Sequence, residues 1–268
     1  MWVATINNLI IMSTEVENNE NNKNPPSLAT EEIKFTERMR KATRKEHRIS
    51  DALINAKMTI GMTDSKVWVE GLRRFYVVYQ YLEIAMKKEE NYNLHKFGQI
   101  NGLLRTQPFE SSLRHYLGEK WPSGITKAMA EYSNYLLCLE NENHVLLSPF
   151  IYHMYMGILS GGQILMAKQR MAFSDGKGSE AFYFDINVRE AKNQLRNEMN
   201  ALAEKLDDET KLRLLKESKM VYLLNNKLVK EVKVPTEILL IKFIFVIGIF
   251  ILVILLWKVS KKFLMVLF

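Results

Sequence analysis

Residues 150–168 read FIYHMYMGILSGGQILMAK, an apolar helical pattern interrupted by Gly157, Gly161 and Gly162. Inside a helix each glycine costs about 1 kcal/mol relative to alanine, so the three together forfeit about 3 kcal/mol of local stability. A glycine also lets another object lie directly against the backbone. The segment is therefore shaped either for a close crossing with another helix or for a broad, flat ligand.

A second informative segment is ATRKEHRISD at residues 42–51. Four side chains in and just before it recur at spacings of four, three and four residues: Arg40, Arg44, His47 and Asp51. This spacing places them on one face of a helix. A neutral imidazole there can bind iron, and two guanidinium groups can hold the carboxylates of the same ligand. The alternative is a solvated basic face that carries a surface histidine.

Taken together, the two segments resemble the heme oxygenase family in its animal-type form with a C-terminal membrane anchor. The YxxYxGxLSGGQ pattern of residues 152–163 is very close to the family's distal-helix signature, and residues 42–51 resemble its proximal-helix segment. The resemblance extends over about residues 35–230. It implies an all-α fold, a single-domain helical bundle that binds heme between these two helices.

The resemblance also implies a role for each matching position. His47 is the expected metal ligand, with Asp51 replacing the family's glutamate as the hydrogen-bond acceptor for its other ring nitrogen, either directly or through water. Gly157 and Gly161 are expected to let the backbone approach the heme closely and leave one meso carbon accessible, and Tyr79 to belong to a distal hydrogen-bond network. The positions expected to bind the rest of the heme are Arg40, Arg44, Tyr152, Lys192, Arg196 and Tyr222.

The activity implied by the resemblance is oxidative opening of heme to biliverdin, carbon monoxide and ferrous iron, with heme as both substrate and prosthetic group. O2 and an NADPH-dependent flavin reductase of the cytochrome P450 reductase type are the implied partners. Two positions depart from the family: Ile158 replaces an aspartate that delivers protons, and Met154 replaces an arginine of the same network. Because losing a general acid can cost about 10²- to 10⁴-fold, slow turnover is expected.

Two other functions compete with this one. A heme-binding sensor or buffer without turnover would keep the histidine and lose the chemistry. A tail-anchored helical adaptor would not take up hemin at all. Spectral conversion of bound hemin to biliverdin separates the first function from the second, and hemin uptake separates both from the third.

Composition supports the helical class. The 268 residues are 47% hydrophobic, with only 12 glycines and 6 prolines, and β-type alternation is nearly absent. The net charge of +7 suits an acidic protein or an anionic membrane surface. Nucleic acid is not an expected partner, because zinc-finger spacing and interleaved basic and aromatic residues are both missing. The single cysteine, Cys138, excludes an internal disulfide and is expected in the core.

The sequence predicts three regions: a flexible leader at 1–30, an all-helical heme-binding domain at 31–232 and a C-terminal membrane anchor at 233–268. Helices are expected at 31–57, 65–88, 96–116, 125–140 and 188–205 and again up to the anchor, with a strand-like piece at 181–185. Residues 238–257 are apolar or glycine except Lys242, and as a helix they span about 30 Å, the thickness of one hydrocarbon core. A tail anchor in the endoplasmic reticulum membrane, with its lipid contacts and a cytosol-facing domain, is expected.

Overall fold

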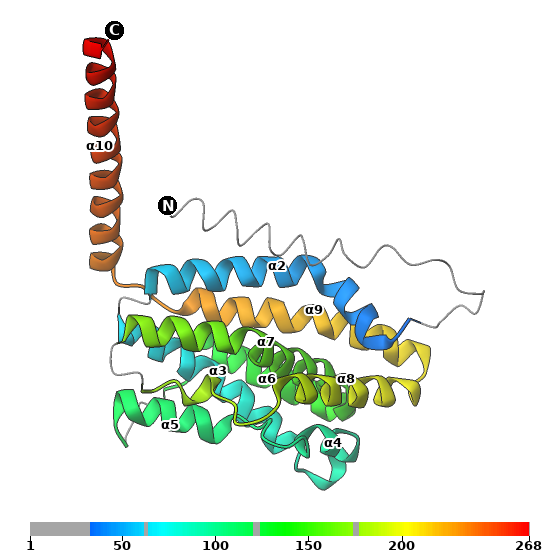
Figure 1. The fold of residues 1–268 in the computed structure, drawn as a ribbon. Coiled ribbons are helices and arrows are strands. Elements are labelled where there is room, and N and C mark those ends of the chain that lie inside the picture. Colours follow the sequence, from blue (N-terminus) through cyan, green and yellow to red (C-terminus); the bar gives the residue numbers. More distant parts are fainter. Residues whose placement is uncertain (1–32, 62–63, 120–123, 174–176, 268) are drawn as a thin grey trace, which may run out of the picture. The chain divides into compact units, whose positions relative to one another are not determined.

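The computed structural model describes residues 33–61, 64–119, 124–173 and 177–267. These residues form helices joined by short connections, which confirms the all-α prediction (Figure 1). The α-helices are α2 (Phe35–Gly61), α3 (Ser65–Ala85), α4 (His95–Gly98), α5 (Thr106–Leu117), α6 (Lys127–Asn143), α7 (Ser148–Ala172), α8 (Val188–Glu204), α9 (Asp208–Glu231) and α10 (Thr236–Leu267). Three 3-10 helices lie between them: η1 (Glu89–Leu94), η2 (His144–Leu147) and η3 (Glu180–Phe182).

Short polar residues start several of these helices. The side chain of Asp64 accepts a hydrogen bond from the backbone N–H of Lys66 at 2.8 Å, and that of Asp207 accepts one from Thr210 at 2.7 Å. Each cap satisfies a backbone donor that has no partner within its helix, which is worth about 1 kcal/mol. The starts of α3 and α9 are thus specified locally by the sequence.

Helix α9 lies at the centre of the arrangement that positions the site, because it packs against α2, α6 and α7. Figure 1 shows α2 and α9 running side by side, with α7 on the other side of α9. Helix α8 packs against both α2 and α7. The two segments that dominate the sequence analysis therefore belong to neighbouring helices held by α8 and α9.

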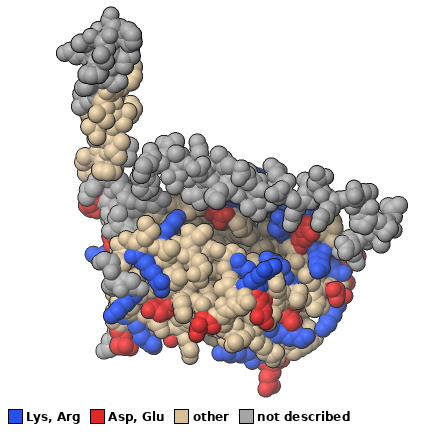
Figure 2. All heavy atoms as spheres, viewed as in Figure 1, with Lys and Arg blue, Asp and Glu red and all other residues tan. Residues whose placement is uncertain are grey.

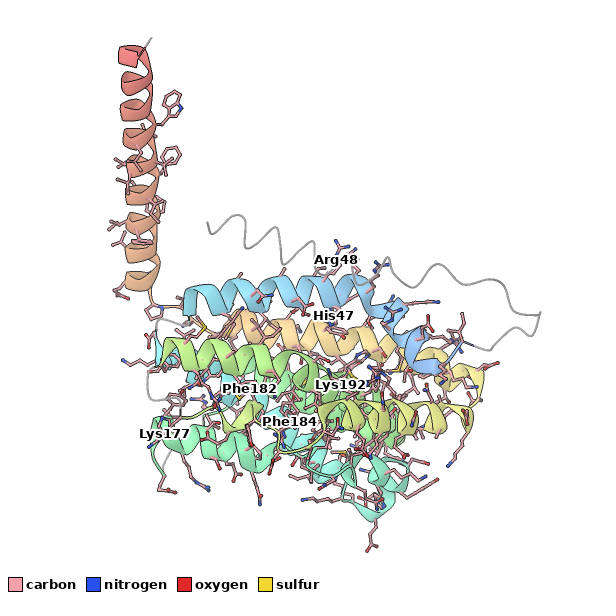
Figure 3. All side chains as sticks on the ribbon, in the orientation of Figure 1. His47, Arg48, Lys177, Phe182, Phe184 and Lys192 are labelled. Carbon is pink, nitrogen blue, oxygen red and sulfur yellow. The ribbon has the colours of Figure 1, made fainter. Side chains whose placement is uncertain are left out.

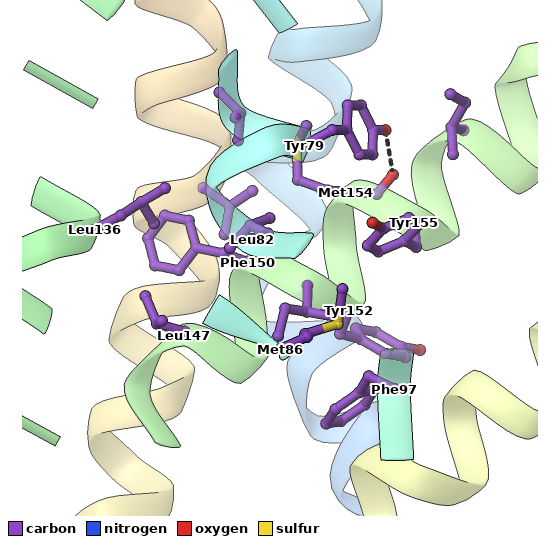
Figure 4. Close-up of a cluster of buried hydrophobic side chains, with 14 of the residues drawn as sticks. Tyr79, Leu82, Met86, Phe97, Leu136, Leu147, Phe150, Tyr152, Met154 and Tyr155 are labelled. Carbon is purple, nitrogen blue, oxygen red and sulfur yellow. Dashed lines mark hydrogen bonds between the residues drawn. The ribbon is translucent and has the colours of Figure 1, made fainter. Parts of the chain in front are cut away.

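The core contains many aromatic side chains. Tyr132, Tyr155, Phe97, Phe109 and Phe150 are among its largest fully buried residues. Figure 4 shows part of this cluster, in which side chains of α3, α6 and α7 meet. Large rings carry much buried apolar area each, so a few of them fix how these helices pack.

Three local predictions need correction. The helix expected at 96–116 is split into α4 and α5, and Gly102 between them adopts the left-handed backbone conformation, with φ of 64°. A Cβ there would meet Ile186 at 2.6 Å, so glycine is also needed for close approach. The strand-like piece expected at 181–185 begins instead as the turn η3. Cys138 is exposed and not in the core.

The two ends of the chain bear differently on the predictions. The leader predicted at 1–30 lies outside the described residues. The predicted anchor region is helical, as α10. Across the described part of the chain, however, no helix has the length and apolarity needed to cross a membrane. The predicted transmembrane helix is therefore not confirmed.

Candidate functional site

The imidazole of His47 stands on the exposed side of α2. Its Nδ1 lies 2.8 Å from Oδ2 of Asp51, one helical turn further along, and 54% of the His47 side chain is exposed. The hydrogen bond to Asp51 raises the pKa of His47, although partial burial opposes the shift. The expected contact between His47 and Asp51 is thus direct. When the Nδ1–H group donates a hydrogen bond to the Asp51 carboxylate, Nε2 carries the lone pair that a metal requires.

Helix α7 turns two of its glycines toward open space. A Cβ built on Gly157 or Gly161 would meet no atom within 4 Å beyond its own chain neighbours and helix backbone. At Gly162, by contrast, a Cβ would lie 3.3 Å from Ile158 and 3.5 Å from Phe182. Close packing against Phe182 of η3 therefore explains Gly162. It does not explain Gly157 and Gly161, which leave a side-chain-free strip of backbone.

Basic groups from two helices gather around a buried tyrosine. Tyr152 of α7 is 7% exposed, and its pKa is raised by burial while Arg196 of α8 and Arg40 of α2 pull it down. Lys192 lies one turn before Arg196, and burial together with the charge of Arg196 lowers the pKa of its ammonium group. Figure 3 shows Lys192 on α8 and His47 on α2. The fold thus brings Tyr152, Arg40, Lys192 and Arg196 together from three helices.

Arg44 lies on the exposed side of α2, about one turn before His47. It therefore shares the helix face of His47, as the spacing predicts. Its predicted part in binding stays a prediction.

Tyr79 of α3 is a buried residue that hydrogen-bonds helix α7. Its side chain is 3% exposed, and its hydroxyl donates to the backbone carbonyl of Met154 at 3.0 Å (Figure 4). Its ring packs against Phe109 and Tyr155, at centroid distances of 5.0 and 5.3 Å. Burial raises its pKa strongly. Tyr79 supports α7 from the core, and its catalytic role remains untested.

The two positions that depart from the family pattern are also buried. Met154 is 5% exposed and Ile158 is 6% exposed. Neither side chain has an acidic proton, so neither can act as a general acid. The titratable side chains on this part of α7 include Tyr152, His153 and Tyr155.

Tyr222 of α9 connects His47 to His153. Its ring meets that of His47 edge-on at a centroid distance of 5.5 Å, and that of His153 at 5.2 Å. Its hydroxyl lies 3.1 Å from Nδ1 of His153. The Tyr222–His153 contact joins residues 69 positions apart and was not predicted. Because His153 lies four residues before Gly157 on α7, His47 and the open glycine strip border the same region of the molecule.

Comparison with known proteins identifies the family to which this chain belongs. The sequence profile named "Heme oxygenase" matches residues 33–231. A heme oxygenase of Rhodella violacea is 30% identical over 202 residues, covering 72% of this chain and 84% of that protein. The crystal structure of heme oxygenase 2 from Chlamydomonas reinhardtii without heme matches with a TM-score of 0.71 and 27% identity, covering 75% of this chain and 99% of that one. The chain belongs to the heme oxygenase family.

The finer prediction of an animal-type member is not supported. Heme oxygenase 1 of Gallus gallus is 35% identical, but over 130 residues, which are 46% of this chain and 43% of that protein. The algal relatives above match over about three quarters of the chain. Family and fold are confirmed, and the animal subtype is not.

Proposed function

We propose that this chain is a heme oxygenase, a heme-degrading monooxygenase that opens heme to biliverdin, carbon monoxide and ferrous iron. Family membership supports the reaction. The observation that carries the proposal in this chain is the imidazole of His47, which Asp51 contacts at Nδ1 at 2.8 Å. The rings of Tyr222 and His153 connect it to the helix that carries the open strip of Gly157 and Gly161. When bound, heme supplies the iron that activates O2, with electrons from a reductase.

The residues present fit a heme in three respects. Nε2 of His47 provides one nitrogen ligand, which is what a heme iron takes from its proximal side. No atom lies within 4 Å of a Cβ built on Gly157 or Gly161, beyond its own chain neighbours and helix backbone, so the backbone there is open to a flat ring. The group formed by Tyr152, Arg40, Lys192 and Arg196 offers donors and positive charge to the two propionates, and Arg44 adds to this charge on α2.

Ile158 and Met154 affect the proposed rate of heme conversion and not the proposed binding of heme. Both place apolar side chains where the family uses a proton-delivering pair, so the chain has no carboxylic acid at this point of α7. A general acid contributes about 10²- to 10⁴-fold to a proton-dependent step. We therefore infer slow turnover. This same observation favours the second candidate, a heme-binding sensor or buffer without turnover.

Hemin titration followed by single turnover tests both candidates. Purified protein should develop a Soret band with hemin, and His47→Ala should lose the spectrum of an imidazole ligand. With a reductase and NADPH, the bound spectrum should convert to that of biliverdin. A stable heme spectrum under every electron supply would favour the buffer, and failure to take up hemin would refute both functions and leave the adaptor.

The proposed electron donor is an NADPH-dependent flavin reductase of the cytochrome P450 reductase type. The net charge of +7 supports an acidic partner. Figure 2 shows basic side chains in several groups on one face, with acidic ones between them. The rate of reduction should fall as salt rises, because ionic strength screens exposed charges. Salt-independent reduction would refute electrostatic docking.

We also propose that the C-terminal region, residues 233–268, anchors the protein to the endoplasmic reticulum membrane through lipid contacts, with the helical domain on the cytosolic side. The apolar run at 238–257 supports this. So does the exposure of large apolar side chains on α10, such as Phe243 and Phe245, at 63% and 68%. The full chain should resist alkaline carbonate extraction from membranes, and a chain ending at residue 232 should not. Equal extraction of the two would refute the anchor.

A further inference from the structure

The contact between Tyr222 and His153 is not explained by the binding of heme alone. It joins α9 to α7, with 3.1 Å between the phenol oxygen and Nδ1 of His153. Nε2 of His153 is buried and has no hydrogen-bond partner in the described part of the chain. A buried ring nitrogen without a hydrogen bond is costly, so the hydrogen bond at Nδ1 is the one that stabilises this buried ring.

His153 acts in this contact as a neutral ring. Burial, together with the charge of the nearby His47 imidazole, lowers its pKa to about 3. A neutral imidazole has one nitrogen that donates and one that accepts. The contact with Tyr222 is thus a hydrogen bond between uncharged groups, whose strength depends on geometry and not on ion pairing.

Tyr222 transmits this constraint to His47. Its ring lies edge-on to the imidazole, at 5.5 Å between centroids and 62° between planes. The other partner of His47 is Asp51, whose side chain is 56% exposed. A solvent-exposed carboxylate on the same helix holds a ring loosely, because ion pairs of this kind are weak. Tyr222 is held at its hydroxyl, which lies 3.1 Å from Nδ1 of His153 and also interacts with Thr43 of α2.

We propose that His153 is a positioning residue: by hydrogen-bonding Tyr222, it fixes the plane of the His47 imidazole before heme arrives. The connection runs from α7 through α9 to α2, so the two helices that bear the open glycines and the metal ligand are tied together through one phenol. The part of this inference that concerns iron ligation rests on the proposed function. The contact itself can be tested without heme.

Four variants isolate the hydrogen bond from general packing. Tyr222→Phe removes the hydroxyl, which interacts with Thr43 of α2 as well as with His153. His153→Phe replaces the imidazole with an apolar ring that cannot hydrogen-bond. His153→Gln restores a polar partner of similar reach. Tyr135→Phe is the matched control, because the Tyr135 hydroxyl also bonds α9, through Glu217 at 2.7 Å. Thermal unfolding of each variant establishes that it folds.

The first readout is NMR of the His47 ring in heme-free protein with labelled histidine. Tyr222→Phe and His153→Phe should each shift and broaden the His47 ring signals, and the double variant should do no more than Tyr222→Phe alone, because the hydroxyl is then already missing. His153→Gln should return the signals toward wild type, and Tyr135→Phe should leave them unchanged. Unchanged His47 signals in both Phe variants would overturn the proposal, whether or not the protein binds heme.

The second readout is the iron–histidine stretching band of the ferrous heme complex in resonance Raman spectra. A less constrained imidazole should broaden this band in Tyr222→Phe and His153→Phe, with hemin affinity about fivefold lower, as loss of one neutral hydrogen bond suggests. If wild-type protein binds no hemin, the proposed function fails while the heme-free NMR result stands. A sharp, unshifted band in both variants would contradict positioning through Tyr222.

Discussion

Substituting Gly157 should change protein stability and heme binding in opposite directions. The new Cβ of Gly157→Ala would meet no atom within 4 Å beyond its own chain neighbours and helix backbone, so the heme-free protein incurs no steric cost. Replacing glycine by alanine inside a helix is worth about 1 kcal/mol, part of it from the smaller entropy of the unfolded chain. For a domain of this size, that gain raises the melting temperature by about 2–4 °C.

Hemin should nevertheless bind the variant more weakly. The added methyl occupies the strip where the ring is proposed to lie against the backbone, and Gly157→Leu should weaken binding further because its side chain extends into the same space. Leucine has nearly the helix propensity of alanine, so the heme-free stability gain should persist in both variants. Differential scanning calorimetry of heme-free protein and hemin titration would measure the two effects separately.

Gly71 provides the matched control. It lies within α3, away from the site, and a Cβ there also meets nothing within 4 Å. Gly71→Ala should therefore stabilise the protein by about the same amount and leave hemin binding unchanged. Destabilisation by Gly157→Ala would mean that another element packs against α7 at that point. Wild-type hemin affinity in Gly157→Leu would refute the glycine strip as the heme-facing surface.

Three further predictions concern the ligand, the basic group and the missing acid. Because Asp51 raises the pKa of His47, their contact stabilises the folded protein fully below the unfolded pKa near 6.5, and this stabilisation is lost as pH rises through the higher folded pKa. Spectroscopic titration should show that binding of iron by His47 weakens as pH falls through the folded pKa. Asp51→Asn should move the midpoint of that titration to lower pH. Arg196→Ala should weaken hemin binding by about threefold, since an exposed charge contributes under about 1 kcal/mol. Binding of the hemin dimethyl ester, which lacks the charged propionates, should be unchanged. An equal loss of affinity for the ester would contradict recognition of the propionates by Arg196. Ile158→Asp should speed single-turnover conversion of heme at least about tenfold. It should also lower the stability of the heme-free protein by about 1–3 kcal/mol, because the carboxyl group replaces a buried apolar side chain. Unchanged conversion in a folded variant would refute the role given to this position.

The helical pattern was well predicted where the signal is local. The helices predicted at 31–57, 65–88 and 188–205 correspond to α2, α3 and α8, with bounds that differ by a few residues. The contact between His47 and Asp51 follows from their spacing of four residues, and the structure shows it directly. Prediction failed where long-range packing decides: Cys138 sits in an apolar run, yet its side of α6 is exposed.

The sequence by itself determined most of the helices, the family and the set of residues that share a helix face, because these follow from spacings of three or four residues and from motif identity. Tertiary structure alone decided that Gly162 packs against Phe182 while Gly157 and Gly161 stay open, and that Tyr222 lies between two histidines. The physical reason is that such contacts depend on where separate helices cross. The position at which two helices cross is set by the packing of the whole core, and no local spacing of residues in the sequence specifies it.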